Sequence, residues 1–530
     1  MEKKSNNTRR LKSAVVAVMV VLALTGVWSY FALYTPYHES ERTRLLTFTT
    51  DLEPKDLDPA LAYDTDSFSI VLNVFDRLVQ YETGSTEIEP SLATSWETPD
   101  PRTYIFNLEE GVMFHDSTPF NATSVKYSFD RAIEMEGYSS YLFSVIESTE
   151  VLDTYKVKIS LYEPFAPFLQ VMAHPAASIV SQAAAEEMGT GTDPPIGFDI
   201  HPVGTGPFKF DHWVQGKELV LTANKEYFKG APQFEKLVFR VTLEAAEREA
   251  ELLRGDVDAV FTSPPGVPAE DLTALEKNPD VRVIKGIGSS IEFLGINTQK
   301  PPLNDIKVRE AIAYAIDYDA IIRDVLGGRA ARIGGPVPPN IFGYKNLSIT
   351  QRDVTKAKQL LTEAGYPDGF EITITYNIDN LARRKTAEVI KKSLADVGID
   401  VAITGLDWKD SIEKYLAMEY EMCINKWIPD YFDADSYLTP QFHSYSLAPN
   451  GANIFGFSDP QVDELIDQAR STLSEDIRLG AYEEAQERIV EQVPVIFLYV
   501  ADIYDVTRYN IGNLVHSPTE FVYAYNLYRR

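Results

Sequence analysis

The sequence contains a single cysteine, Cys423, so neither an intrachain disulfide nor a cysteine-based zinc cluster can form. Cys423 stands in the apolar stretch Met422–Ile424, which predicts a buried and unreactive thiol. The seven histidines are scattered, and no two of them have the i, i+4 spacing with which a helix presents a metal site. We therefore expect neither a metal nor a cofactor.

Basic residues are also few, because 49 lysines and arginines face 78 aspartates and glutamates, for a formal net charge of −29. A phosphate backbone needs a basic face, so nucleic acid is excluded as a partner. The G-x-S-x-G, H-E-x-x-H and G-x-x-x-x-G-K-[ST] motifs are all absent. The sequence thus contains no familiar catalytic motif, and we expect a protein that is not an enzyme.

Long hydrophobic runs are limited to one, from Ser13 to Tyr34, which follows a basic segment at residues 1–12. About 20 apolar residues suffice to span a bilayer as a helix, and basic residues stay on the cytoplasmic side. We expect a cytoplasmic tail at 1–12, a single-pass anchor at 13–34, a polar tether at 35–44 and the rest of the chain outside. A cleaved signal peptide is the alternative, although no small-x-small cleavage site stands out.

The length of 530 residues predicts two or three domains. Two segments alternate strand, helix and strand, at 237–261 and 370–405, with Gly255 and Gly398 placed to end the helices. Each predicts a β-α-β crossover and hence a partly parallel sheet. Residues 85–165 are rich in short strands and turns, which indicates a separate β-rich subdomain.

Further helices are predicted from apolar periodicity at 308–326, from Pro460 onward and at 478–492, with a buried strand at 493–500. Asp305 is expected to cap the first of them. Gly204-Thr205-Gly206-Pro207 resembles a phosphate cradle but lacks the following Lys-Ser/Thr, and Pro207 removes an amide donor. We interpret residues 204–207 as a turn that leads into a strand, and we expect this turn also to line a ligand cleft.

Residues 426–437 hold three carboxylates among aromatic residues, a composition compatible with three chemistries: catalysis, metal binding and anchoring of a cation. A calcium loop counted from Asp433 requires Gly at its sixth position, where Leu438 stands, so calcium fails. A glycosidase carboxylate pair stays open. Asp433 and Asp435 are interpreted as solvated. Asp430, after Trp427-Ile-Pro, is suited to hold an ammonium group in an aromatic, partly desolvated setting.

Seven ordered motifs resemble the solute-binding proteins of the peptide/nickel class of ABC importers, the dipeptide- and oligopeptide-binding family, over roughly residues 45–525. They are Leu57–Ala60, Asn73–Val79, Pro90–Glu97, Tyr104–Asp116, Pro202–Phe208, Asn297 with Pro302–Ile312 and Ala315–Asp317, and Ala357–Phe370. The resemblance implies a two-lobed α/β fold of the periplasmic-binding-protein type (cluster C) with an extra β-rich subdomain. Lobe 1 is expected at 45–294 plus 505–530, with the subdomain at about 72–201, and lobe 2 at 295–504.

The resemblance also implies a function: a short peptide is enclosed between the lobes by hinge closure and delivered to an ABC permease with its ATPase. In peptide-binding relatives, an Asp three residues after a Trp binds the α-ammonium of the ligand, and here that pattern is Trp427 and Asp430. The resemblance places Tyr63–Ser67 and Val203–Pro207 at the cleft by position.

The expected ligand-binding residues are Tyr63, Thr205, Gly206, Asn297, Trp408, Trp427 and Asp430. Two alternatives stay open, an oligosaccharide receptor that stacks sugars on Trp408 and Trp427, and a surface hydrolase that uses Asp430. We expect a monomer.

Overall fold

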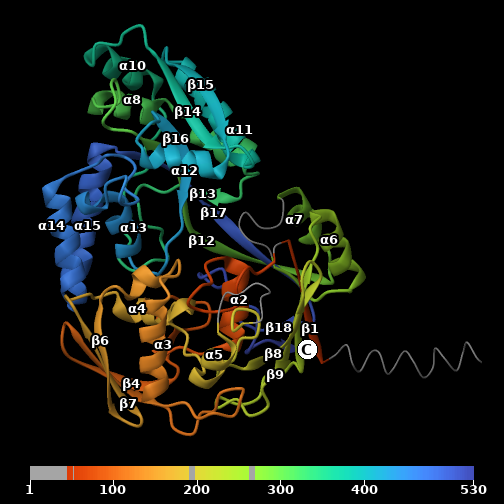
Figure 1. Cartoon of the computed structure of the whole chain (residues 1–530). Coiled ribbons are helices and arrows are strands. Elements are labelled where there is room, and N and C mark those ends of the chain that lie inside the picture. Colours follow the sequence, from red (N-terminus) through yellow and green to blue (C-terminus); the bar gives the residue numbers. More distant parts are fainter. Residues whose placement is uncertain (1–43, 52, 190–196, 262–268) are drawn as a thin grey trace, which may run out of the picture.

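The computed structural model describes residues 44–51, 53–189, 197–261 and 269–530 (Figure 1). The expected tail, the anchor at 13–34 and nearly all of the tether lie outside these ranges. None of the helices within the described ranges is both long and apolar enough to cross a bilayer.

One large mixed sheet runs through the molecule in the order β15-β14-β16-β12-β17-β11-β1-β10-β9-β8, with β13 paired to β17. Its strands are β1 (Leu45–Thr50), β8 (Phe208–Val214), β9 (Glu218–Ala223), β10 (Lys236–Val241), β11 (Ala259–Val260), β12 (Val281–Ile296), β13 (Ala330–Ala331), β14 (Glu371–Asn377), β15 (Asp400–Leu406), β16 (Met422–Trp427) and β17 (Val495–Arg508). We call the part built on β1 and β8–β11 lobe 1, and the part built on β14–β16 lobe 2.

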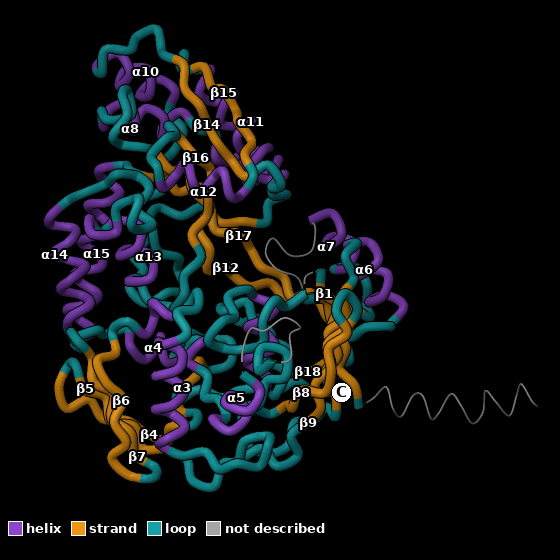
Figure 2. The backbone as a smooth tube through the Cα atoms, in the orientation of Figure 1, coloured by secondary structure: helices purple, strands orange, loops and turns teal. Residues whose placement is uncertain are grey.

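The long antiparallel strands β12 and β17 join the two lobes and run through the middle of the molecule in Figure 2. Their pairing is regular from Val281 to Ile287 and resumes at Ile291, with a second register shift just after Glu292. Such irregularities bend and twist a ladder locally. The two strands therefore connect the lobes through an interrupted rather than a continuous ladder.

Both predicted β-α-β units are confirmed. In lobe 1, β10 and β11 flank β1 and both run parallel to it, with α6 (Ala245–Arg254) between them in sequence. In lobe 2, β14 and β15 are parallel neighbours connected by α11 (Leu381–Ala395). Gly255 and Gly398 have φ of +76° and +89° after these helices, a conformation that favours glycine.

The predicted β-rich subdomain is also present, at the lower left of Figure 1. It comprises an antiparallel sheet in the order β4-β5-β7-β6, the hairpin β2-β3, and several short helices. These elements are β2 (Val79–Tyr81), β3 (Ile88–Pro90), β4 (Ala93–Asp100), β5 (Thr103–Leu108), β6 (Ile146–Asp153), β7 (Lys156–Leu161), α3 (Ala122–Glu134), η1 (Ser140–Phe143), α4 (Phe168–Ala173) and η2 (Pro175–Ala177). Buried aromatic side chains, including Tyr104, Phe106 and Phe129, fill its core.

Among the remaining helices, α14 and α15 form the left flank of lobe 2 (Figure 1). Lobe 1 has α2 (Thr65–Val74), α5 (Gln182–Met188) and α7 (Ala269–Leu275). Lobe 2 has α8 (Ile306–Ala315), α9 (Tyr318–Ala320), the π-helical turn η3 (Ile321–Val325), α10 (Val354–Glu363), α12 (Trp408–Leu416), α13 (Asp435–Phe442), η4 (Ser444–Ser446), α14 (Pro460–Ser471) and α15 (Glu475–Gln492).

One predicted helix, 308–326, is divided in the structure. Asp305 does cap α8, since its carboxylate accepts from the N–H of Lys307. The helix ends at Ala315 because Ile316 is extended and Asp317 starts a new helix by accepting from the N–H of Ala320. A short carboxylate side chain competes with the helix for backbone donors, so it favours a cap over an interior position.

The C-terminal segment after β17 returns to lobe 1. It contains the small ladder of β18 (Ile511–Gly512) with β19 (Tyr528–Arg529). Asn73 of α2 holds it on both sides, because Asn73 Nδ2 donates to the carbonyl of Val522 and its Oδ1 accepts from the N–H of Ala524. The family-like motif around Asn73 thus has a structural use, which is to position the segment that lines the site described next.

Candidate ligand-binding site

A cavity of about 430 Å³ lies between the lobes, within the size range of small-molecule sites. Its wall combines α2 and the β2 hairpin of lobe 1, the end of β16 in lobe 2 and the C-terminal segment. The polar and aromatic residues in the wall are Tyr63, Asp64, Thr65, Phe68, Arg77, Gln80, Tyr81, Glu82, Thr83, His174, Phe261, Ser289, Lys426, Asp430, Phe432, Asp505, Asn513, Ser517, Thr519, Glu520, Phe521, Tyr523 and Asn526.

The two lobes are in direct contact beside this cavity. The N–H of Phe432 lies 3.4 Å from the hydroxyl of Tyr81, and the rings of these two residues are 5.1 Å apart. The N–H of Ala166, in the subdomain, donates to the carbonyl of Arg470 near the end of α14 at 2.7 Å. The structure therefore has its lobes together around the cavity.

Asp430 lies at the wall of the cavity, just beyond the end of β16. Its backbone N–H donates to Ser436 Oγ at 2.9 Å, which holds the turn, and Tyr141 of the subdomain hydrogen-bonds to its carboxylate. Burial raises the pKa of Asp430, and the Tyr141 bond only partly opposes this effect. A bound cation stabilises the ionised form of a carboxylate in this setting, because it replaces the stabilisation by water that burial removes.

Tyr63, another expected site residue, also lines the cavity and is 54% exposed. The centroid of its ring lies 5.6 Å from that of Tyr138. Burial raises the pKa of Tyr63, and the nearby charge of Asp430 raises it further. Trp427 is close by in sequence but has a different role: its indole N–H donates to the carbonyl of Ser436 at 2.7 Å. Trp427 thus holds the turn that presents Asp430 rather than lining the cavity wall.

The solvated interpretation of Asp433 and Asp435 is wrong, since both residues have no exposed surface. Asp433 forms an ion pair with Arg478 of α15, and Asp435 lies 3.3 Å from Arg470 Nε of α14. Tyr431 also donates to Asp435 at 2.7 Å. The arginines are more than 30 residues away in sequence, so only the packing of α14 and α15 onto this turn creates the pairs.

Thr205 and Gly206, expected at the cleft, lie beside Val74 instead. Thr205 is 1% exposed and donates to Asp76 Oδ2 at 2.9 Å. A Cβ on Gly206 would lie 2.5 Å from the carbonyl carbon of Val74, so glycine permits a close approach of two backbones. The turn leads into β8 as predicted, but neither of its expected site residues is part of the cavity wall.

Asn297 and Trp408 are likewise separate from the cavity. Asn297 is fully buried, and its side-chain amide donates to the carbonyls of Met418 and Tyr420 at 3.0 Å each. Trp408 begins α12 and is 55% exposed. Neither Asn297 nor Trp408 is among the residues that line the cavity.

Sequence reasoning missed several charged residues of the wall, among them Arg77, Lys426 and Glu520. Burial lowers the pKa of Lys426 and raises that of Glu520, while the opposite charges of the two residues partly counter both shifts. Arg77 lies within the family-like motif at 73–79, and Lys426 lies within the cluster of carboxylates and aromatic residues at 426–437. Nothing in either sequence pattern indicates that these two side chains line the cavity. Glu520 lay in no motif.

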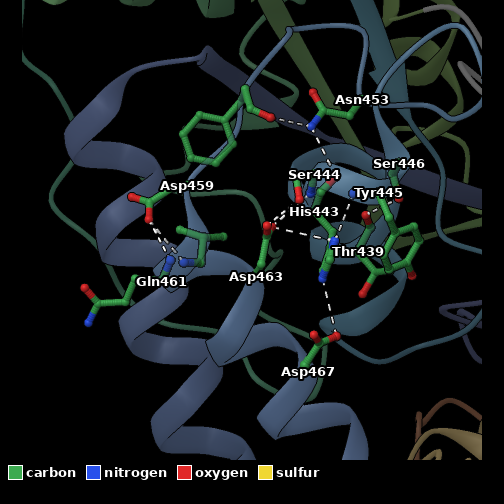
Figure 3. A network of polar contacts seen from close by, with 12 residues as sticks. Thr439, His443, Ser444, Tyr445, Ser446, Asn453, Asp459, Gln461, Asp463 and Asp467 are labelled. Carbon is green, nitrogen blue, oxygen red and sulfur yellow. Dashed lines mark hydrogen bonds and ion pairs between the residues drawn. The ribbon is translucent and has the colours of Figure 1, made fainter.

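One expectation and one polar network lie away from the cavity. Cys423 is fully buried, which confirms the predicted burial, and burial raises the pKa of its thiol to about 12. Figure 3 shows His443 between two acidic residues of α14, with Nε2 at 3.3 Å from Asp467 Oδ1. Asp463 accepts from the N–H and the hydroxyl of Ser444, so this network ties η4 to α14.

Comparison with known proteins places these features in a family. The family model for bacterial extracellular solute-binding proteins, family 5 middle, matches residues 87–448. Heme-binding protein A of Haemophilus influenzae is 31% identical over 86% of this chain and 87% of its own length. Di/tripeptide-binding protein 2 of Pseudomonas aeruginosa is 30% identical over 90% of this chain and 93% of its own.

A solved structure shares the fold. The ABC transporter-associated periplasmic binding protein DppA from Helicobacter pylori, in complex with peptide STSA, has a TM-score of 0.77 and 30% identity, covering 92% of this chain and 99% of that one. The similarity confirms the two-lobed α/β fold and the resemblance found in the motifs. It also supports an extracytoplasmic location, and the family consists of binding proteins rather than enzymes. This chain belongs to the bacterial extracellular solute-binding proteins of family 5.

Proposed function

We propose that the chain is the substrate-binding component of an ABC importer and captures short peptides with a free amino terminus between its lobes. The observation that carries this proposal is Asp430, a carboxylate at the wall of an interlobe cavity whose pKa is raised by burial. An α-ammonium group supplies the missing counter-charge in a charge-assisted hydrogen bond. Two relatives named above, the di/tripeptide-binding protein and the peptide-bound H. pylori protein, agree with this ligand class.

The backbone of the cavity wall supports peptide as the ligand class. Residues 428–430 follow directly on β16, and residues 513–527 are largely irregular, so both carry main-chain groups outside regular ladders. Main-chain pairing gives affinity without requiring a particular side chain on the ligand. Delivery to a permease and its ATPase follows from membership of an importer family, and no catalytic step is part of this proposal.

The oligosaccharide alternative gains no support from the two tryptophans on which it rested. Trp427 directs its indole N–H to Ser436, and Trp408 begins a helix away from the cavity wall. The hydrolase alternative has one carboxylate, Asp430, but the two that accompany it in sequence are engaged by Arg478 and Arg470.

Membrane attachment is a separate part of the proposal. The run at 13–34, preceded by basic residues, would anchor a monomeric receptor with residues 45–530 outside the cytoplasm. Alkaline carbonate washing of membranes from expressing cells tests this, because a single-pass protein stays with the membrane. Release of a shortened chain would instead support cleavage.

Ligand capture is tested on the full-length chain in detergent, denatured and refolded to remove co-purified ligand. A library of dipeptides to tetrapeptides is offered, retained peptides are identified by mass spectrometry, and the tightest is measured by calorimetry. N-acetylation of that peptide is expected to weaken binding by about 2–5 kcal/mol, because it leaves the Asp430 carboxylate without a cation. Retention of hemin or oligosaccharides with no peptide retained would overturn the peptide proposal.

A further inference from the structure

The loop between β7 and α4 of the subdomain brings one aromatic side chain, Phe165, against lobe 2. Phe165 is 4% exposed, and the N–H of the next residue, Ala166, donates to the carbonyl of Arg470 in lobe 2 at 2.7 Å. Pro164 and Pro167 flank these two residues of the loop. Proline fixes its own φ and restricts the residue before it, so such a loop has few alternative conformations. The loop therefore holds Phe165 in a defined place.

Two side chains of lobe 2 contact the ring of Phe165. The ring of Tyr431 meets it edge to face, with the two centroids 6.2 Å apart. The guanidinium carbon of Arg470 lies over the same ring, 5.3 Å from its centroid. Both arrangements are attractive, because an aromatic ring is negative on its face and positive at its edge. We call Tyr431, Arg470 and the carboxylate that orders them, Asp435, the socket of Phe165.

Tyr431 is packed in the core of the subdomain although it belongs to lobe 2. It is 8% exposed and is a member of the buried apolar cluster that fills the subdomain, together with Phe165. Separation of the lobes would take Tyr431 out of this cluster and expose its ring to water, which is unfavourable. The closed arrangement therefore gains a buried aromatic contact that separated lobes lack.

Asp435 holds both walls of the socket from within lobe 2. The hydroxyl of Tyr431 donates to Asp435 Oδ2 at 2.7 Å, and Arg470 Nε lies 3.3 Å from Asp435 Oδ1. Burial raises the pKa of Tyr431, so its hydroxyl stays protonated and remains a donor. All three side chains of the socket belong to the same lobe. The socket is therefore built into lobe 2 and needs no part of the subdomain to order it.

The turn that bears the socket tyrosine also bears Asp430. The N–H of Asp430 donates to Ser436 Oγ at 2.9 Å, and the indole N–H of Trp427 donates to the carbonyl of Ser436 at 2.7 Å. These bonds tie the two ends of the turn together. Because Asp430 and Tyr431 are adjacent on a turn held in this way, they move together. Docking of Tyr431 on Phe165 therefore brings Asp430 to the cavity wall at the same time.

We propose that Phe165 and its socket form a latch that regulates closure of the two lobes. The latch stabilises the closed arrangement by an amount that does not depend on the ligand, and the contacts of the ligand add to it. Ligand affinity rises with the population of the closed arrangement, so the latch sets how tightly every ligand is held. The effect on ligand capture rests on the proposed function, whereas the effect on closure rests on the fold alone.

Closure is tested in the full-length chain with spin labels at Glu97→Cys in β4 and Lys409→Cys in α12. Both positions are exposed, whereas the native Cys423 is fully buried and not accessible to the label. Pulsed electron paramagnetic resonance reports the distances between the labels, without and with the tightest-binding peptide. Tyr431→Leu and Phe165→Leu each keep an apolar side chain but remove the contact between the rings. Both are expected to shift the ligand-free chain toward longer distances.

Binding is measured by calorimetry on the same variants without the labels. Each is expected to weaken peptide binding about threefold to tenfold, as for loss of one aromatic contact. The loss should be equal for the peptide and its N-acetylated form, because the latch does not contact the ligand. The double variant should bind about as weakly as either single variant, since both remove the same contact. Tyr162→Leu is the control: Tyr162 belongs to the same loop but is 63% exposed, so this variant should change neither distances nor affinity.

The outcomes separate the latch from the proposed function. If peptides bind but both leucine variants keep the wild-type distances and affinity, the latch is overturned and the receptor function stands. Additive losses in the double variant also overturn it, because each residue then acts only within its own lobe. If no peptide binds while the variants lengthen the ligand-free distances, the proposed function fails and the latch stands. If a leucine variant does not fold, Tyr431→Phe, which removes only the bond to Asp435, should show a smaller shift in the same direction, and no shift would overturn the latch.

Discussion

The hydroxyl of Tyr141 donates a hydrogen bond to the carboxylate of Asp430. Tyr141 belongs to the β-rich subdomain and Asp430 to lobe 2, so this bond joins the two lobes at the edge of the cavity. It favours the ionised form of Asp430, whereas burial favours the neutral form and prevails. The carboxylate is therefore held in an environment that is unfavourable for its charge until a cation arrives.

Replacement of Asp430 by asparagine is expected to stabilise the ligand-free chain at pH 7 while weakening peptide binding. Burial raises the pKa of Asp430 in the folded state, so ionisation of this carboxyl destabilises the fold. This destabilisation is complete above the folded-state pKa and absent below the unfolded-state pKa of about 3.9. Asp430→Asn should raise the melting temperature at pH 7 but not at pH 3.5. Peptide affinity should fall by about 2–5 kcal/mol in calorimetry.

The matched control is Glu82→Gln, which removes a carboxylate that also lines the cavity but is exposed. This variant should change neither the melting temperature nor the effect of N-acetylating the peptide. Equal losses of affinity in Asp430→Asn and Glu82→Gln would argue that the cavity attracts cations only through its general negative charge.

Peptide affinity is expected to depend on pH through Asp430. Binding of an ammonium group requires the ionised carboxylate, so affinity should fall as the pH is lowered through the raised pKa. Tyr141→Phe removes the bond that lowers this pKa, and the midpoint of the affinity profile should therefore move to higher pH. Calorimetric titrations between pH 4 and 8 would show this, and an unmoved midpoint in Tyr141→Phe would contradict it.

The ion pair of Asp433 with Arg478 is expected to stabilise lobe 2 strongly. Both side chains are buried, at 0% and 7% exposure, so removing one partner leaves an uncompensated charge. Asp433→Ala should lower the free energy of unfolding by about 3–5 kcal/mol in urea titrations. Lys409→Ala serves as the control, because Lys409 and Glu413 are both exposed and 3.9 Å apart, and it should have no measurable effect.

Two glycine-to-alanine substitutions are expected to act in opposite directions. Gly206→Ala would place a Cβ 2.5 Å from the backbone of Val74, and overpacking of this kind costs about 1–3 kcal/mol. Gly480 is in α15 with no atom near its Cβ position, so Gly480→Ala should stabilise by about 1 kcal/mol. Thermal unfolding of the two variants would show both signs, and tolerance of Gly206→Ala would mean that the two backbones can separate.

Stability should also carry a pH-dependent contribution from His516, which contacts β17. Burial lowers the pKa of His516, but its hydrogen bond to Asp505 at 2.9 Å and the charges of Asp505 and Glu520 outweigh burial, so the pKa is raised. The contribution is fully present below the unfolded pKa of about 6.5 and is lost as pH rises through the folded pKa. His516→Gln should therefore be less stable than the wild type at pH 5.5, with a smaller difference at pH 8.5.

Local patterns identified several secondary-structure elements correctly, because such patterns depend on residues close in sequence. Alternation and glycine placement predicted the units at 237–261 and 370–405, and Asp459-Pro460 marked the start of α14. The division of the predicted helix 308–326 shows where this reasoning stops. Periodicity continued through Asp317, but the cap formed by its side chain decided the local backbone.

The sequence by itself determined the family, the two α/β units, the β-rich subdomain and the prominence of Asp430, since these depend on ordered motifs and local spacing. Only the tertiary structure decided which polar residues serve the cavity. Asp433 and Asp435 meet arginines of α14 and α15, whereas Arg77 has no such partner and faces the same cavity as Asp430. The physical reason is that solvation and pairing of a charge depend on which distant segments pack around it, and residue type and spacing do not specify that.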